Sequence, residues 1–149
     1  MTNPQPRVST LLTVIRQTAR VMLDDLVARL HAAGYPDITA AHQSVFENID
    51  RDGTRLTTLA ERSGITHQSM GELVQALEHA GYLERRPDAS DRRARLIHLT
   101  PKGSDLVRHA IAHSSEIEAT WRQQFQQTGH DIDLRALLET ALPARTTSG

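Results

Sequence analysis

The sequence predicts a mainly α-helical protein that carries one small β-hairpin, an α+β fold in which helices dominate. Three observations support this fold class. Apolar residues recur at helical spacing over most of the 149 residues. Glycine and proline interrupt that spacing at intervals that suit short helices. One proline-broken stretch, ERRPDASDRRARL from Glu84 to Leu96, instead has the pattern of short strands around a turn.

The N-terminal third of the chain predicts a long amphipathic helix followed by a shorter one. The first helix ends near Gly34 and Pro36, and Thr39 is suited to the N-cap of the second. The run DRDG from Asp50 to Gly53 then indicates a turn. The apolar faces comprise Val8, Leu11, Leu12, Ile15, Ala19, Met22, Leu23, Leu26, Val27 and Leu30 in the first helix, and Val45, Phe46 and Ile49 in the second.

The stretch from Leu56 to Leu83 predicts two helices joined by a tight turn. The first begins at residue 57 or 58 and stops at Gly64, a residue that tolerates left-handed geometry. Thr66 caps the second helix, and Gly81 ends it where a left-handed C-cap favours glycine. The small core that the two helices share is expected to contain Leu59, Ala60, Ile65, Met70, Leu73, Val74 and Leu77.

A hairpin and two further helices complete the predicted order of elements. Residues 82–86 and 93–99 are strand candidates on either side of the loop PDASD. Thr100 and Pro101 read as an N-cap followed by proline at the first helical position. A last short helix spans about residues 132–142. The apolar residues of these two helices are Leu106, Val107, Ile111, Ile117, Trp121 and Phe125, and then Ile132, Leu134, Leu137, Leu138 and Leu142.

Composition excludes several classes of protein. Hydrophobic residues make up 38% and charged residues 23%, which is ordinary for a globular protein. The chain has no cysteine, so disulfides, thiolate metal sites and thiol oxidation are excluded. No apolar run approaches the roughly 18 to 20 residues needed to span a bilayer. The N-terminus, MTNPQPR, lacks the apolar core of a signal peptide, so we expect a cytoplasmic protein.

The two predicted helices from Leu56 onward have the spacing of a helix-turn-helix. In that motif the second helix enters the major groove of DNA with its N-terminal residues leading. Here those residues are short and able to form hydrogen bonds with base edges or phosphates. The alternative is that they serve only capping and surface polarity. The candidates for DNA contact are Thr66, His67, Gln68, Ser69 and Glu72.

The stretch after the second helix concentrates positive charge in a chain whose net charge is only -1. Between Arg85 and Arg95 there are five arginines against two aspartates. An arginine-rich hairpin in this position suits a wing that reaches an adjacent minor groove, where the potential is negative. Asp91 lies two residues before Arg93, so we expect it to brace that arginine. The DNA-contact candidates in the hairpin are Arg85, Arg86, Arg92, Arg93 and Arg95; the alternative is a solvated, salt-bridged turn.

The run GYLERRPDASDRRARLIHLTPKG, from Gly81 to Gly103, resembles the wing of the multiple antibiotic resistance regulator (MarR) family. The preceding LTTLAERSGITHQSMGELVQALEHAG resembles that family's helix-turn-helix. The resemblance implies a homodimeric winged-helix transcription regulator, usually a repressor, on a pseudo-palindromic operator. This chain departs from the family at Gly71 and Glu72, where a hydroxyl and then a basic residue are common. Glu72 would instead accept from a cytosine amino group or from an internal partner.

The order of elements also predicts how the chain is divided. Residues 39–100 form a winged helix-turn-helix DNA-binding domain, and residues 8–36 and 101–142 form a helical dimerisation region. The helices of the second group are too apolar for lone surface elements, so we expect burial against a second copy. Residues 1–7 and 143–149 are expected to be disordered.

Three further hypotheses concern ligands. The resemblance implies that many members release DNA on binding a small aromatic ligand, and Arg16, His42 and Phe46 are candidates to hold an anionic aromatic compound. Alternatively, Phe46 belongs to the core, Arg16 to the surface and His42 to a hydrogen-bonded interface.

His109 and His113 share a helical face and could bind zinc, although a solvated pair is the favoured interpretation. We expect no cofactor and no catalytic activity, because enzyme motifs are missing. The remaining alternatives are a metal-responsive regulator and a winged-helix protein-interaction module.

Overall fold

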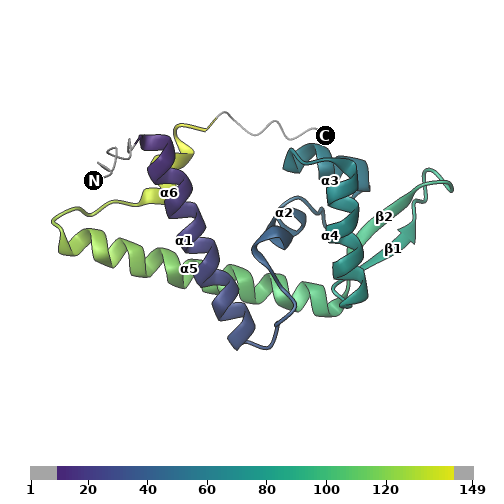
Figure 1. Ribbon diagram of the computed structural model, residues 1–149, viewed down its shortest axis with the longest axis horizontal. Coiled ribbons are helices and arrows are strands. Elements are labelled where there is room, and N and C mark those ends of the chain that lie inside the picture. The colour runs from purple at the N-terminus through teal and green to yellow at the C-terminus, as the bar shows by residue number, and fades with distance from the viewer. Residues whose placement is uncertain (1–9, 143–149) are drawn as a thin grey trace, which may run out of the picture. The chain divides into compact units, whose positions relative to one another are not determined.

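The computed structural model describes residues 10–142, and these residues form the mainly helical fold with one hairpin that the sequence predicts (Figure 1). The elements run α1 (Leu11–Ala32), a 3-10 turn (Ala40–His42), α2 (Gln43–Phe46), α3 (Leu56–Ser63), α4 (His67–His79), β1 (Leu83–Pro87), β2 (Arg95–Leu99), α5 (Pro101–Gln127) and α6 (Leu134–Glu139). The predicted disordered ends, residues 1–7 and 143–149, lie outside the described residues, as does Val8. Between residues 10 and 142, none of the helices is long and apolar enough to cross a membrane.

The chain divides into two compact units between His113 and Ser114, so α5 contributes to both. The first unit contains α1 to β2 and the start of α5. The second contains the rest of α5 and α6. The predicted division into a DNA-binding domain and a dimerisation region is a statement about function, and it stays a prediction.

Capping residues define the two ends of helix α1. Thr10 is its N-cap, where its hydroxyl accepts a hydrogen bond from the Thr13 N–H at 3.2 Å. Gly34 follows the helix with a φ of 99°, which confirms the predicted end. Leu30, near the C-terminal end, is buried, whereas Leu11 and Leu12 are 76% and 74% exposed. The N-terminal half of α1 therefore presents an apolar surface that its own unit does not cover.

The second predicted helix is less regular than the sequence suggested. A 3-10 turn follows Thr39, and only then does the short α2 begin. The His42 Nδ1 accepts a hydrogen bond from the Thr39 N–H at 3.1 Å, which fixes the turn. Val45 is fully buried in the core of the unit.

Helices α3 and α4 form the predicted helix-turn-helix. Gly64 adopts the left-handed conformation between them, with a φ of 66°. The Thr66 hydroxyl caps α4 by accepting from the Ser69 N–H at 3.1 Å. Helix α3 begins at Leu56, slightly earlier than predicted. The core that the two helices share with the rest of the unit includes Leu59, Ala60, Met70, Val74 and Leu77, all buried.

The hairpin lies beside α4, and its loop reaches beyond the helices (Figure 1). Strands β1 and β2 pair antiparallel, from Leu83 opposite Leu99 to Pro87 opposite Arg95. Thr54, just before α3, adds an isolated bridge to Ile97 of β2, and its N–H and C=O both bond there at 3.0 and 2.9 Å. The backbone therefore joins the middle of β2 to the residue that lies two positions before α3.

Helix α5 begins at Pro101, as predicted, and Thr100 caps it by accepting from the Gly103 N–H at 3.1 Å. In the second unit, Trp121 and Phe125 pack edge to face with ring centroids 6.3 Å apart. Helix α6 is shorter than the predicted 132–142, because Asp133 caps it at the Ala136 N–H. The apolar side chains of Leu137, Leu138 and Leu142 are exposed there.

Candidate nucleic-acid interface

The N-terminal turn of α4 presents a polar surface. Thr66, His67, Gln68 and Ser69 are all exposed, because Met70, Val74 and Leu77 form the buried face of the helix. Thr66 is also committed to capping, since its hydroxyl lies 2.9 Å from the Ser69 hydroxyl and accepts the Ser69 N–H. The structure thus brings the predicted contact residues together at one accessible helix end.

Glu72 is exposed one turn further along α4 and has an internal partner. Its carboxylate accepts a hydrogen bond from the Gln68 side-chain amide at 3.3 Å, an i, i+4 pair on the helix surface. Of the two roles that the sequence left open for Glu72, the structure shows the internal one. The pair also restricts the amide of Gln68, which would otherwise rotate freely.

The five hairpin arginines divide into two groups. Arg85 donates to the carboxylate of Glu78 on α4 at 2.9 and 3.1 Å, and Arg86 pairs with Glu84 on the same strand. Arg92, Arg93 and Arg95 are exposed, and their guanidinium groups have no partner among residues 10–142. The positive charge of the hairpin is therefore uncompensated near its loop and compensated along β1.

Asp91 contacts the backbone of Arg93 and not its guanidinium group. Its Oδ1 accepts the Arg93 N–H at 3.0 Å, which closes a local turn. Asp91 therefore holds Arg93 through its backbone N–H, and its role in DNA binding stays a prediction. The guanidinium of Arg93 is left to face solvent.

Sequence reasoning missed a second aspartate in the loop. Asp88 is buried although its neighbours are exposed, and its Oδ1 accepts from both the N–H and the hydroxyl of Ser90, at 2.8 and 2.7 Å. Its Oδ2 accepts from Nε and Nη2 of Arg55 at 3.1 and 2.6 Å. The spacing of Asp88 and Ser90 is a local signal for such a turn. No local pattern points to Arg55, which lies 33 residues away.

These donors determine the charge of Asp88. Hydrogen bonds from Ser90 and from Arg55 hold the pKa of the Asp88 carboxyl well below its usual range, so it is ionised at any physiological pH. The same ion pair raises the pKa of Arg55. Asp88 and Arg55 therefore neutralise each other at the end of β1, and the loop beyond them keeps the charge of Arg92 and Arg93.

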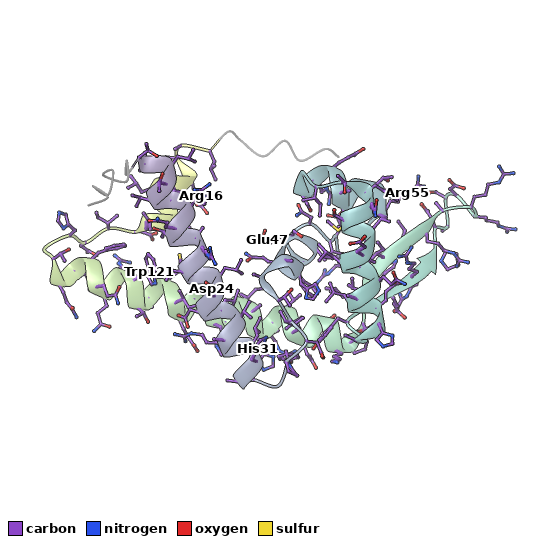
Figure 2. The ribbon with its side chains drawn as sticks, viewed as in Figure 1. Arg16, Asp24, His31, Glu47, Arg55 and Trp121 are labelled. Carbon is purple, nitrogen blue, oxygen red and sulfur yellow. The ribbon has the colours of Figure 1, made fainter. Side chains whose placement is uncertain are left out.

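The three residues predicted to hold a ligand do not all line the groove beside His42, and their shared role stays a prediction. His42 is buried and lines a shallow groove of about 560 Å³ together with Asp37, Glu72, Gln75 and His79. Phe46 packs against the core, and neither it nor Arg16 lines this groove. Arg16 is exposed near the N-terminal end of α1 (Figure 2). Burial lowers the pKa of His42.

His109, one of the two histidines predicted as a pair on α5, has its own contacts within the first unit. The His109 Nδ1 lies 3.0 Å from the Tyr35 hydroxyl and 2.8 Å from the Asp105 carbonyl oxygen. Across residues 10–142, no three histidine, aspartate or glutamate side chains come together as a set of metal ligands.

A helix-turn-helix followed by a hairpin with free arginines defines the winged-helix class of nucleic-acid-binding domains. Comparison with known proteins narrows the class. A model described as "MarR family" matches residues 37–94. The HTH-type transcriptional regulator PetP of Rhodobacter capsulatus is 32% identical over 110 residues, which cover 71% of this chain and 66% of PetP. The chain belongs to the MarR family, a family of transcription regulators, although it spans just under two thirds of the length of PetP.

Solved structures share the fold. The crystal structure of RV1404 from Mycobacterium tuberculosis has a TM-score of 0.67 and 25% identity, and the match covers 93% of this chain and 100% of that one. A crystal structure of an S. aureus MepR–DNA complex has a TM-score of 0.63 and 22% identity, covering 89% and 98%. At this identity the second match is informative about the fold alone.

Proposed function

We propose that this chain regulates transcription by binding double-stranded DNA in the cytoplasm as a homodimer. The N-terminal turn of α4 enters the major groove, and the wing, defined here as β1, β2 and the loop of residues 88–94, reaches the neighbouring minor groove. One observation carries the proposal: Arg92, Arg93 and Arg95 are exposed and have no partner among the described residues. Arginines that face solvent together in a winged helix suit the negative potential of a groove.

The apolar surfaces of the two units support a homodimer. In the first unit Leu11 and Leu12 are largely exposed, and in the second Leu137 and Leu142 are exposed as well. A monomer rarely leaves such side chains exposed to water, whereas a two-fold symmetric dimer would bury the same apolar surface on both copies. A two-fold dimer presents two α4 helices to DNA, so its operator would be a pseudo-palindrome with half-sites one helical turn apart. S. aureus MepR, which has the same fold, has been crystallised as a complex with DNA, and this supports DNA as the partner proposed for this chain.

The proposal includes repression of transcription and its release when a ligand binds. The groove beside His42 includes Glu72 and Gln75 of α4, so a compound bound there would contact the DNA-reading helix directly. Such a compound controls DNA binding only if it prefers one position of α4 over another. The carboxylates of Asp37 and Glu72 favour a neutral or basic compound over the anionic one expected from Arg16.

Substitution of the wing arginines tests the proposal. A duplex would first be selected by the protein from a pool of random sequences. Arg92→Ala and Arg93→Ala are each expected to weaken binding to this duplex by about fivefold or more in a fluorescence anisotropy titration, because a charged contact is lost twice per dimer. Arg108→Ala is the control, since this exposed arginine lies on α5 and is paired with Asp105. Equal, small effects of all three substitutions would contradict the wing assignment, and a failure to select any duplex would favour the protein-interaction alternative.

A further inference from the structure

Asp88 forms several of the hydrogen bonds that close the wing loop. Besides the Ser90 contacts, its N–H donates to the Ala94 carbonyl at 3.1 Å, and its own carbonyl accepts the Asp91 N–H at 3.3 Å. The Ala94 N–H donates in turn to the Asp91 carbonyl at 2.9 Å. The loop that carries Arg92 and Arg93 is therefore closed by backbone hydrogen bonds at Asp88, and the Asp88 carboxylate holds the first turn of this loop through Ser90.

Arg55 holds the Asp88 carboxylate against the helix-turn-helix. It is the residue before α3, and Figure 2 shows it on the side of the unit where the hairpin lies. Two of its N–H groups converge on one oxygen of Asp88, and its Nη2 lies 3.9 Å from Asp91. The preceding residue, Thr54, forms the backbone bridge to Ile97. Adjacent residues thus fix the wing at two points, one in the middle of β2 and one at the end of β1.

The two points constrain different motions. The Thr54 bridge fixes the middle of β2, but a two-stranded ribbon anchored only there can still twist and bend towards its tip. The Arg55–Asp88 pair acts where β1 ends, next to the loop. The Asp88 side chain is only 10% exposed, so water competes weakly for this contact.

We propose that Arg55 and Asp88 are positioning residues for DNA binding: their ion pair sets the wing loop on the helix-turn-helix so that Arg92 and Arg93 meet the minor groove while α4 occupies the major groove. This inference rests on the proposed function. Neither residue has to touch DNA in this role. The pair links the element that reads bases to the element that reads the minor groove, and it fixes the spacing between them.

Replacing Asp88 with asparagine distinguishes a positioning role from a simple effect of charge, because the two change the affinity for DNA in opposite directions. Asp88→Asn makes the wing less negative, so a reading based on charge alone expects tighter binding to a polyanion. If Asp88 is a positioning residue, Asp88→Asn should instead bind DNA more weakly, because an amide cannot hold the guanidinium of Arg55 as strongly as a carboxylate does. Asp52→Asn is the matched control: Asp52 is an exposed acid in the turn before Thr54, and it has no partner among the described residues.

The first measurement is the affinity of each folded variant for the selected duplex. Asp88→Asn is expected to bind about tenfold more weakly than wild type, and Asp52→Asn equally or slightly more tightly. Arg55→Gln is expected to lose about tenfold as well. Its control is Arg62→Gln, which removes the same charge from a side chain with the same 43% exposure; Arg62 lies in α3, the helix that Arg55 precedes, and is paired with Asp50 outside the wing. The double variant, Arg55→Gln with Asp88→Asn, is expected to be no worse than the weaker single variant.

The second measurement is a footprint, which a merely structural loss of stability would not change selectively. Hydroxyl-radical cleavage reports protection of the minor groove, and dimethyl sulfate reports protection of guanine N7 in the major groove. At saturating protein, Asp88→Asn and Arg55→Gln are expected to lose the flanking minor-groove protection and to keep the major-groove protection.

Each outcome decides the inference. If wild type binds no duplex, the proposed function fails. If wild type binds but Asp88→Asn binds as tightly as Asp52→Asn, with the wing footprint intact, the positioning role is wrong and the proposed function stands. If Asp88→Asn does not fold, Arg55→Gln against Arg62→Gln gives the answer, because equal losses in those two variants overturn the inference.

Discussion

A methyl group added at Gly103 tests how the wing is attached to α5. Gly103 is buried in the first turn of the helix. A Cβ at this position would lie 2.1 Å from the carbonyl oxygen of Tyr82 and 3.2 Å from Cδ2 of Leu99. The first distance is far inside van der Waals contact, so Gly103→Ala requires the Tyr82 peptide or the start of α5 to move.

The cost follows from what holds Tyr82. Its side chain is fully buried, its N–H donates to the Leu77 carbonyl at 2.9 Å, and its carbonyl accepts the Thr100 N–H at 3.0 Å. Overpacking of a rigid site costs about 1 to 3 kcal/mol. A weakened Thr100 hydrogen bond adds about 1 kcal/mol. We expect Gly103→Ala to lower the free energy of unfolding by about 3 kcal/mol, or Tm by about 6 to 12 °C for a chain of this length.

The assay is thermal unfolding followed by circular dichroism at one fixed protein concentration, since Tm of a dimer depends on concentration. Gly71→Ala is the matched control. Gly71 lies inside α4, and a Cβ there meets only Leu56 Cδ2 at an ordinary 3.7 Å. Alanine is favoured over glycine in a helix by about 1 kcal/mol, so Gly71→Ala should raise Tm by about 2 to 4 °C. The reasoning is refuted if Gly103→Ala leaves Tm unchanged, or if the two substitutions act in the same direction.

Two further predictions concern pH and assembly. Burial lowers the pKa of His42 in the folded state below the ordinary 6.5. The unfolded chain therefore binds this proton more readily, so the contribution of neutral His42 is complete above about pH 6.5 and is lost as pH falls towards the folded pKa. Urea unfolding of wild type and His42→Gln between pH 8 and pH 5 is expected to show a steeper loss for wild type, and parallel curves would contradict this. Leu12→Asp places a charge on the exposed apolar face of α1 and is expected to shift the protein from dimer to monomer in light scattering, whereas an unchanged mass would place the dimer interface elsewhere.

Local chemistry made much of the fold predictable. The turn glycine Gly64, the cap Thr66 and the Thr100–Pro101 start of α5 all act within a few residues, and each is found where the sequence placed it. The resemblance of LTPKG to a family pattern also acquires a physical reason, because only a residue without Cβ fits at Gly103 against the Tyr82 carbonyl.

The candidate interface was predictable only as a set of residues. Exposure of the α4 N-terminal turn follows from helical periodicity, but which arginines are free depends on partners far away in sequence. Arg85 is paired because Glu78 of α4 faces β1, and Asp88 is buried because Arg55 reaches it from before α3. Such contacts depend on tertiary packing, which leaves no periodic signal in the chain. For the same reason the sequence gives no indication that Asp37, Gln75 and His79 line a groove with His42, and the ligand hypothesis that joins Arg16 to His42 stays a prediction.

The salt dependence of DNA binding tests the central claim most directly. Three unpaired wing arginines in each protomer give six in a dimer, and each phosphate contact contributes about -0.9 to the slope of log K against log salt. Titration of wild type against the selected duplex at several salt concentrations is expected to give a slope of about -5 or steeper, with weaker binding to random duplex at every salt concentration. A slope near zero, or equal affinity for both duplexes, would contradict the proposal that this chain is a sequence-specific DNA-binding regulator.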